Sequence, residues 1–293
     1  MDHLTTLESE SIAILRESYA LFKKPLALYS VGKDSSVLLH LIIKSFAPSK
    51  PRIPLLHIDT GFKFPEMIEF RDRRAKELGF KLIVHRNEQA INNGTNPYRD
   101  GIASCCGQLK TAALLEALGA QGCDAAIGGA RRDEEISRAK ERFFSFRDTF
   151  GQWEPRGQRP ELWRIFNAQI KEGESMRIFP LSNWTEADIW EYIKREGIEV
   201  VPLYFGEKRL VFRNNDQLMP FMEKSAEQGS EYEEMVRYRT LGCYHCTAAV
   251  KSEAKTLDEI IAETSIARIS ERSTRVIDHG ANSMEDKKRE GYF

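Results

Sequence analysis

The sequence has no apolar run near the roughly 20 residues that a membrane-spanning helix needs. Its opening, MDHLTTLESESIAIL, is acidic, whereas a secretory signal peptide begins with basic residues. Neither sign of charge prevails, because 43 basic and 44 acidic side chains leave a formal net charge of -1. This balance excludes a nucleic-acid-binding protein held mainly by overall positive charge, although a local basic groove is compatible with it. We therefore expect a cytoplasmic protein with no membrane segment.

Cysteine is scarce, with five residues in 293, and a reducing cytoplasm would keep these thiols from forming disulfides. Four of them stand in two close pairs, Cys105–Cys106 and Cys243-x-x-Cys246. Closely spaced thiolates bind an iron–sulfur cluster or a zinc ion, and free or buried thiols are the alternative. Adjacent cysteines suit tetrahedral zinc poorly, which favours the cluster. Cys123 stands alone, and we expect it to pack in the core.

Short apolar segments alternate with amphipathic ones over the first 200 residues. The predicted strands are 25–29, 53–58, 81–85, 123–127 and 176–181. The predicted helices are 7–22, 37–43, 64–78 and 109–118. Thr185, followed three residues later by Asp188, predicts the start of a further helix. This alternation predicts an α/β fold with a Rossmann-like parallel sheet, helices on both faces and a ligand site at the carboxyl ends of the strands.

The alternation of apolar and amphipathic segments weakens after residue 200. Residues 206–234 are polar and rich in glutamate, and we predict a mobile connection there. From Arg237 onward the chain contains the second cysteine pair and an arginine-rich tail. The sequence thus predicts a larger domain over residues 1–200 and a smaller C-terminal subdomain over residues 201–293.

Residues 30–36, Ser-Val-Gly-Lys-Asp-Ser-Ser, lie between a predicted strand and a predicted helix. The start of a helix exposes unpaired backbone N–H groups and the positive end of the helix dipole, which favour a phosphate group. Gly32 lets the backbone approach an anion, and Lys33 adds positive charge. The spacing of a Walker A loop is absent. From these residues alone, a polar turn that caps a helix is the alternative to a phosphate site.

This loop resembles the PP-loop of ATP pyrophosphatases, which cleave ATP between its α and β phosphates. The resemblance extends over nearly the whole chain to the family that contains PAPS reductases and the small subunits of ATP sulfurylase. The stretches that carry it are YSVGKDSSVLLHL, PLLHIDTGFKFPEM, FRDRRAKELG, DAAIGGARRDEEISRAKER, FSFRDTFGQWEPRGQRPELW, GESMRIFPLSNWTEADIWEYI, VPLY, RTLGC and KKREGYF. The resemblance implies a fold of the adenine nucleotide α-hydrolase type. It also implies an enzyme that adenylates an oxyanion by attack on the ATP α-phosphate, with ATP and Mg²⁺ as cofactors and pyrophosphate as a product.

The resemblance also assigns residues by position. Those expected to hold the nucleotide are Ser30, Gly32, Lys33, Asp34, Ser35, Ser36, Asp59, Gly128 and Gly129. Those expected to act in catalysis are Lys33, Asp34, Arg131 and Arg132. Asp34 would also help to hold Mg²⁺, and the two arginines would stabilise charge that develops at the α-phosphate. For Arg138, Lys140 and Arg142, binding of the acceptor and a solvated helix face both remain open.

The cysteines depart from the ATP sulfurylase small subunits. In those proteins the first pair is missing and the second stretch has only its first cysteine. The complete set resembles the [4Fe–4S] motif of the adenylylsulfate reductases, and a four-cysteine cluster also occurs in DNA-phosphorothioation pyrophosphatases. The predicted cluster ligands are Cys105, Cys106, Cys243 and Cys246, with zinc as the alternative metal, and we expect His245 to lie beside the metal rather than bind it.

The cysteines make DNA phosphorothioation our leading functional prediction. The chain would adenylate a DNA backbone phosphate for sulfur insertion, with a cysteine desulfurase and other phosphorothioation subunits as partners. The alternative is the small subunit of a sulfate adenylyltransferase, which makes adenylylsulfate from ATP and sulfate beside a GTPase large subunit. Reduction of adenylylsulfate is disfavoured because no cysteine follows Cys246. The intact phosphate loop disfavours a non-catalytic scaffold. A homodimer is compatible with the sequence, although no long heptad specifies one.

Overall fold

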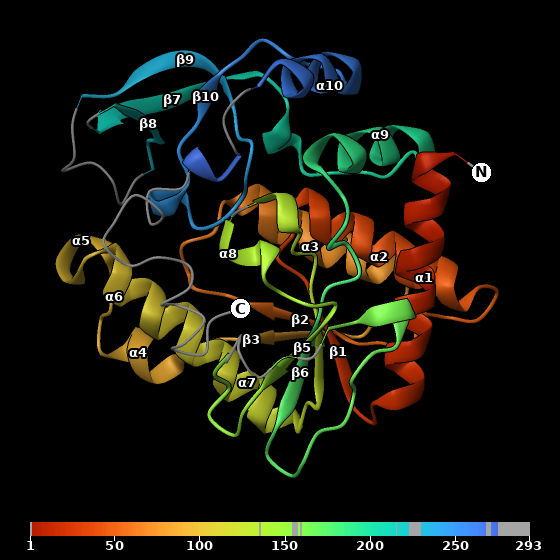
Figure 1. The fold of residues 1–293 in the computed structure, drawn as a ribbon. Coiled ribbons are helices and arrows are strands. Elements are labelled where there is room, and N and C mark those ends of the chain that lie inside the picture. Colours follow the sequence, from red (N-terminus) through yellow and green to blue (C-terminus); the bar gives the residue numbers. More distant parts are fainter. Residues whose placement is uncertain are drawn as a thin grey trace.

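The computed structural model describes residues 2–134, 136–153, 158, 160–214, 216–222, 230–267 and 271–274. Six strands form its main sheet (Figure 1): β1 (Pro25–Leu28), β2 (Leu55–Ile58), β3 (Leu82–His85), β4 (Ala125–Ile127), β5 (Phe144–Arg147) and β6 (Ser175–Ile178). Their order is β3-β2-β1-β4-β6-β5, and every neighbouring pair is parallel except β5 with β6. The predicted parallel α/β sheet is therefore confirmed, with an antiparallel strand added at one edge.

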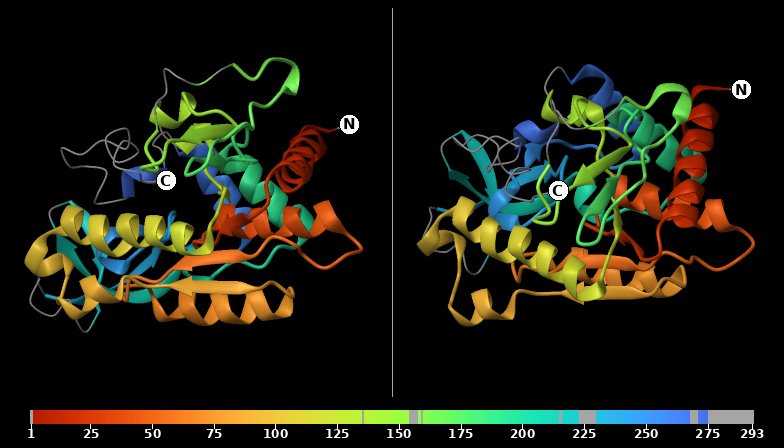
Figure 2. Two further views of the ribbon diagram at one scale, coloured as in Figure 1. Left: turned by 90° about the horizontal axis from the view of Figure 1, so that it is seen from below. Right: turned by 60° about the horizontal axis from the view of Figure 1, so that its bottom comes forward.

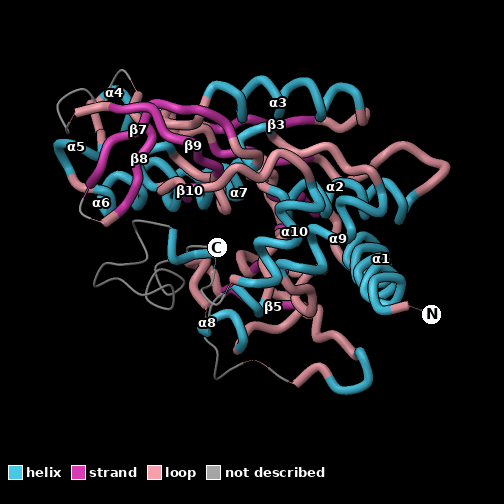
Figure 3. Tube along the Cα trace, turned by 90° about the horizontal axis from the view of Figure 1, so that it is seen from above, coloured by secondary structure: helices cyan, strands magenta, loops and turns pink. Residues whose placement is uncertain are grey.

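Helices cover both faces of this sheet. They are α1 (His3–Leu21), α2 (Lys33–Phe46), α3 (Pro65–Glu77), α4 (Glu88–Asn92), α5 (Pro97–Asp100), α6 (Ile102–Cys106), α7 (Ala113–Gln121), α8 (Ile136–Ala139), α9 (Glu186–Glu196) and α10 (Leu257–Ile266). Figure 2 shows α3 and α7 on opposite sides of the strands. Figure 3 shows α1, α2, α9 and α10 side by side, in agreement with their contacts. In the part of the chain that is described, no helix is both long enough and apolar enough to cross a bilayer.

The order of the strands sets the position of the ligand site. Ala27 of β1 pairs with Leu55 of β2 on one side and with Ile127 of β4 on the other. The chain leaves β1 toward β2 and returns from β3 to β4, so the connections diverge between β1 and β4. A crevice outside the carboxyl ends of the strands opens at such a point. The loops that follow β1 and β4, which contain the predicted phosphate loop and the Gly128–Gly129 pair, meet there.

The predicted mobile connection over residues 206–234 is wrong for the residues that are described. Strands β7 (Glu207–Asn214), β8 (Gln217–Pro220), β9 (Tyr232–Arg237) and β10 (Val250–Lys251) form a second, antiparallel sheet in the order β10-β9-β7-β8. In β7, Leu210 is exposed while Val211 and Phe212 are buried. Val211 and Phe212 are adjacent and so point to opposite faces, and the residues at both ends of β7 are exposed and polar. Burial therefore does not alternate along β7, and the alternation that would predict a strand is missing. Residues 215 and 223–229 lie outside the described part.

Several boundaries differ from the predicted ones. The predicted fifth strand is β6, because the short edge strand β5 precedes it. Helix α2 begins at Lys33 rather than Val37, and the predicted helix at 109–118 begins within a π-helical turn at Gly107–Ala112. Thr185 is confirmed as the N-cap of α9, with a reciprocal hydrogen bond between its backbone and Asp188. Cys123 packs against the apolar cluster of β1, β2 and α7, as predicted. The arginine-rich tail lies outside the described residues, and the domain boundary at residue 200 stays a prediction.

Candidate functional site

A cavity of about 180 Å³ lies at the carboxyl ends of β1, β2 and β4. Its apolar part includes Leu28, Leu56, Ile58 and Leu114. Seven of the residues predicted from the sequence line it: Ser30, Gly32, Lys33, Asp34, Ser35, Gly128 and Gly129. The cavity thus combines an apolar wall, which suits a base, with the start of α2, where backbone N–H groups and the helix dipole favour phosphate.

The phosphate loop has a strained backbone. Val31 is buried and has a φ of 67°, a left-handed conformation that a β-branched residue rarely adopts. Such strain persists where the surrounding structure holds it, and it clusters at functional sites. The backbone N–H of Lys33 donates to the Tyr204 hydroxyl at 2.7 Å. Tyr204 lies in the turn of 3-10 helix Pro202–Tyr204, so a segment far along the chain covers the first turn of α2.

The serine hydroxyls of the loop turn back onto it. Ser35 and Ser36 both donate to the carbonyl oxygen of Gly32, at 2.9 and 3.1 Å, and Ser30 donates to the Ser35 hydroxyl at 3.4 Å. Ser36 is buried and is not among the residues that line the cavity. These hydroxyls therefore shape the turn, and Ser30 and Ser35 also reach the cavity surface.

Lys33 is buried and belongs to an ion network. Its ammonium contacts the Glu271 carboxylate and lies 3.5 Å from Asp34 and 4.0 Å from Glu186. Burial by itself lowers the pKa of Lys33, but the attraction of Asp34, Glu271 and Glu186 outweighs it and raises the pKa above its usual value. Lys33 is therefore a fixed cation beside the start of α2.

The loop after β4 packs directly on the phosphate loop. A Cβ at Gly129 would lie 3.1 Å from the carbonyl carbon of Asp34, so glycine allows this close approach. Arg131 is almost fully buried, and its Nε donates to the Asp34 carboxylate at 2.6 Å. Its guanidinium also pairs with Glu271. Burial opposes the charge, yet Glu271 and Asp34 raise the pKa of Arg131 well above its usual value. Arg131 thus joins Lys33 at the site.

Two predicted site residues point elsewhere. Arg132 donates to the backbone oxygen of Glu141 and stacks over the Phe143 ring at 4.8 Å, on the side of β5. This placement gives no geometric support to a catalytic role for Arg132. Asp59 accepts from the N–H of Gly61 and is not among the residues that line the cavity. It shapes the turn after β2, and its assignment to the nucleoside stays a prediction.

Arg138 is buried and lines the cavity, so it is not on a solvated helix face. Its Nε lies 3.1 Å from the Glu134 carboxylate. Its Nη1 has no hydrogen-bond partner among the described residues. Lys140, in contrast, is exposed, and Arg142 is half-buried. Of the three cations for which the sequence left two roles open, Arg138 is the one that reaches the cavity.

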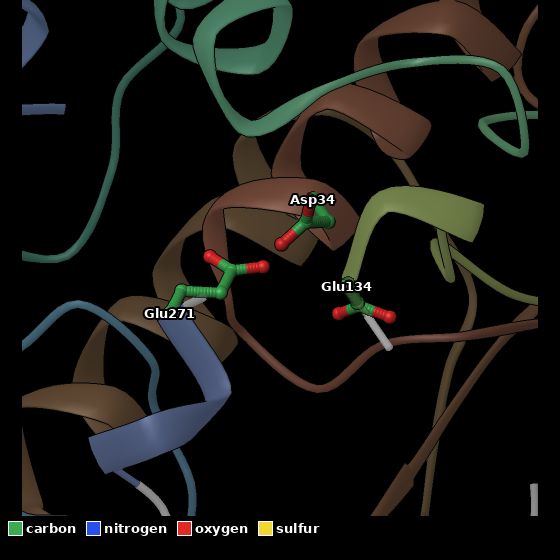
Figure 4. A group of neighbouring side chains, drawn as sticks. All are labelled: Asp34, Glu134 and Glu271. Atoms are coloured by element: carbon green, nitrogen blue, oxygen red, sulfur yellow. The ribbon is translucent and has the colours of Figure 1, made fainter. Parts of the chain in front are cut away.

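Three carboxylates gather at the cavity (Figure 4). Oxygen atoms of Asp34, Glu134 and Glu271 lie within 4.8 Å of one another. The sequence analysis identified only Asp34. Glu134 belongs to the GGARRDEE stretch and could have been found there, whereas Glu271 is far along the chain and carries no local signal. Tyr204 belongs to the VPLY stretch, which was noted but not assigned to the site.

Cys246 contacts both Cys106 and Cys243 beside the loop after β2, Cys105 lies in the same neighbourhood, and we call these four residues the thiol cluster. The turn around Cys243 pairs with Lys63, and the Cys243 sulfur lies 3.0 Å from the Thr60 hydroxyl. The sulfur atoms of Cys106 and Cys246 lie 3.7 Å apart. Because Lys63 also lines the cavity, the thiol cluster lies next to the nucleotide pocket.

The protonation of the thiol cluster fits a metal centre. The hydrogen bond from Cys246 lowers the pKa of Cys106 to about 5, and a bond from the same thiol lowers the pKa of Cys243 well below its usual value. Burial raises the pKa of Cys105 to about 12. The direction of these two shifts favours the thiolate form, which iron–sulfur clusters and zinc require. His245 is buried beside Cys106, and its predicted place next to a metal stays a prediction.

The comparisons with known proteins identify the family of this chain. The family model described as phosphoadenosine phosphosulfate reductase domain matches residues 24–249. Sulfate adenylyltransferase subunit 2 of Saccharophagus degradans is 56% identical, over 100% of this chain and 98% of its own. The corresponding protein of Marinobacter nauticus is 55% identical, over 99% of this chain and 97% of its own. FMN adenylyltransferase of Candida glabrata shares the fold, with a TM-score of 0.51 and 15% identity over 93% of this chain and 87% of that chain.

These relatives support only one of the two predicted functions. Their name corresponds to the alternative, sulfate adenylyltransferase, and they lend no support to the leading prediction of DNA phosphorothioation or to an iron–sulfur cluster. Adenylyl transfer is common to both predictions. The chain is an enzyme of adenylyl transfer, and it belongs to the phosphoadenosine phosphosulfate reductase domain family.

Proposed function

We propose that this chain is the catalytic subunit of a sulfate adenylyltransferase, which transfers the adenylyl group of ATP to sulfate and releases pyrophosphate. The observation that carries the proposal is the 56% identity to a sulfate adenylyltransferase subunit 2 over the full length of both chains. The cavity at the start of α2 supports it, because this cavity combines an apolar wall with a helix start, and these suit the base and the phosphates of a nucleoside triphosphate.

The β and γ phosphates would lie at the first turn of α2. Gly32, Asp34 and Ser35 line the cavity in this region, and Lys33 supplies a fixed positive charge. Asp34 and Glu134 have oxygen atoms close enough to share one cation, and Mg²⁺ prefers such oxygen ligands together with substrate phosphates. When bound, Mg²⁺ would neutralise charge on the pyrophosphate that leaves.

The acceptor would lie against Arg138. This buried guanidinium lines the cavity and has an N–H group without a protein partner among the described residues. A guanidinium binds the oxygen atoms of a tetrahedral anion through paired hydrogen bonds. A sulfate oxygen would attack the α-phosphorus, the bond between that phosphorus and the bridging oxygen to the β-phosphate would break, and pyrophosphate would leave with the electron pair. No oxidant or reductant is needed.

A large subunit is part of this proposal. The relatives are named as subunit 2 of their enzymes, and the resemblance described above points to a GTPase partner. We infer that this chain supplies the adenylyl-transfer site, whereas the partner would couple the reaction to GTP.

The thiol cluster favours a second candidate, adenylation of a DNA backbone phosphate for sulfur insertion. The proposed attack of sulfate on the α-phosphorus uses none of the cysteines, and Cys106 lies 3.7 Å from Cys246 while the backbone at Cys243 pairs with Lys63 at the cavity. In this candidate, Cys105, Cys106, Cys243 and Cys246 would hold a [4Fe–4S] cluster, or zinc, that ties the second sheet to the pocket or relays sulfur from a cysteine desulfurase. Metal analysis after anaerobic purification tests it, with Cys106→Ala as the variant and Cys123→Ala as the control. About four irons per wild-type chain, lost in Cys106→Ala only, would support the cluster, and a metal-free wild type would remove it.

The choice of acceptor tests the main proposal. Wild-type chain, with the large subunit of an ATP sulfurylase present, is incubated with α-³²P-labelled ATP, Mg²⁺ and GTP, and with either sulfate or duplex DNA. We expect labelled adenylylsulfate and an equal amount of pyrophosphate with sulfate, and no label transferred to DNA. Labelled DNA, or pyrophosphate release that is independent of sulfate, would contradict sulfate as the acceptor. Arg138→Gln should raise the sulfate concentration needed for half-maximal rate by about tenfold or more, in line with the loss of one charge-assisted hydrogen bond.

A further inference from the structure

We propose that the Glu271 carboxylate is an internal ligand of the anion subsite formed by Lys33 and Arg131, and that a phosphate group of ATP displaces it. This inference rests on the proposed function, because it requires ATP to bind at the start of α2. It adds a competition within the chain that neither the family nor the sequence pattern indicates.

The contacts of Glu271 carry the proposal. Its side chain is 3% exposed, and its two oxygen atoms pair with different cations, one with the Lys33 ammonium and the other with the Arg131 guanidinium. Glu271 follows Lys33 by 238 residues, so this ion pair connects the 3-10 helix Glu271–Thr274 to the phosphate loop. Figure 4 shows Glu271 reaching from that helix toward Asp34 and Glu134.

The two cations form a subsite that suits a phosphate group. An ammonium and a guanidinium that converge on one point are the donors that proteins use for phosphate, and a bidentate carboxylate engages such donors in a similar way. Other carboxylates lie near these cations: Asp34 at 2.6 Å from Arg131 and 3.5 Å from Lys33, Asp133 at 3.3 Å from Arg131, and Glu186 at 4.0 Å from Lys33. Glu271 differs from them because it is buried and each of its two oxygen atoms pairs with one of the two cations, an arrangement that a phosphate group would reproduce.

The size of the cavity also supports displacement of Glu271. At about 180 Å³, the cavity is smaller than the roughly 300–1,000 Å³ of pockets that hold drug-sized ligands. ATP is a ligand of this size class. Glu271 is one of the residues that line it. Movement of this side chain would both enlarge the cavity and uncover Lys33.

Among the described residues, the helix that carries Glu271 is held at its other end by Thr274. The carbonyl oxygen of Thr274 accepts from the N–H of Ala248 at 2.9 Å, and the hydroxyls of Thr274 and Thr240 lie 3.3 Å apart. Both partners belong to the region of the second sheet and the thiol cluster rather than to the phosphate loop. Release of Glu271 therefore breaks its two ion pairs without breaking the anchor at Thr274.

The test measures binding of α,β-methylene-ATP to the wild type, to Glu271→Gln and to the control Glu253→Gln, whose carboxylate is exposed. Each titration is done with Mg²⁺ and with a chelator instead. We expect Glu271→Gln to bind the nucleotide at least threefold more tightly in both conditions, because the competing anion is gone, and Glu253→Gln to bind like the wild type. Unchanged or weaker binding to Glu271→Gln in both conditions would overturn the proposal. Weaker binding only with Mg²⁺ would overturn it too, since Glu271 would then be a ligand of the cation.

A second measurement needs no substitution. Hydrogen exchange of the wild type is followed for peptides that contain residues 271–274, with and without α,β-methylene-ATP. Displacement predicts faster exchange in these peptides when the nucleotide is bound, and slower exchange would contradict it. If neither the wild type nor Glu271→Gln binds the nucleotide although both are folded, the proposed function fails first. If both bind equally, only the displacement fails.

Discussion

At the scale of single residues, burial in the cavity determines the protonation state of His57. It lies on β2 and lines the cavity, and its Nδ1–H donates to the carbonyl oxygen of Tyr29 at 2.8 Å. Burial, together with the charge of Lys63, lowers its pKa from 6.5 to about 3, against the smaller opposite effect of Asp59. The imidazole is therefore neutral in the folded protein at any pH at which the protein is handled.

This shift predicts a pH-dependent stability. Between pH 6.5 and pH 3 the unfolded chain binds a proton on His57 and the folded chain does not, so acid stabilises the unfolded state. The free energy of unfolding should fall as the pH decreases through this window, by up to about 1.4 kcal/mol per pH unit from this group. Urea titrations at pH 7.5 and 5.5 should show that His57→Gln loses less stability than the wild type. Equal losses of stability in His57→Gln and in the wild type would refute the assignment.

At the scale of elements, the approach of the loop after β4 to the start of α2 depends on Gly129. Since a Cβ there would meet the backbone of Asp34 at 3.1 Å, Gly129→Ala should push the phosphate loop out of place. We expect nucleotide affinity to fall by about tenfold, which corresponds to about 1.4 kcal/mol, measured by titration with α,β-methylene-ATP. Gly119→Ala is the matched control, because Gly119 lies in α7 with nothing within 4 Å of the added carbon. It should keep the affinity and be slightly stabilised, whereas a Gly129→Ala protein with wild-type affinity would contradict this packing.

The elements also show what the sequence could and could not reveal. The strands β1, β2, β3 and β4 are short apolar runs that end in polar loops, so local pattern was enough to predict them. The phosphate site between β1 and α2 was predicted from the family resemblance, because the residues of that loop alone also fit a polar turn that caps a helix. The strands β7 and β9 are rich in glutamate and arginine, and their burial does not alternate from residue to residue, so no local pattern separates them from a loop. Arg131 and Arg132 are neighbours in the sequence but diverge in space, since the turn Arg132–Glu134 directs only the first toward Asp34.

At the scale of the whole molecule, the site joins parts of the chain that are far apart. The phosphate loop receives Tyr204 and Glu271 from beyond residue 200, and the turn around Cys243 pairs with Lys63 after β2. These long-range contacts arise only when the second sheet docks on the first, so no spacing in the sequence could have predicted Glu271. The same docking brings the four paired cysteines together, which their spacing did suggest.

The central claim is that ATP is cleaved at the start of α2, and pyrophosphate release tests it most directly. The rate is measured with ATP, Mg²⁺, sulfate and the large subunit for the wild type and for Asp34→Asn, which keeps the shape of the side chain and removes the charge that Arg131 contacts at 2.6 Å. Circular dichroism of both proteins shows whether the fold persists. We predict at least a hundredfold loss of pyrophosphate release in a folded Asp34→Asn protein. A folded variant that releases pyrophosphate at the wild-type rate would contradict the assignment of the site.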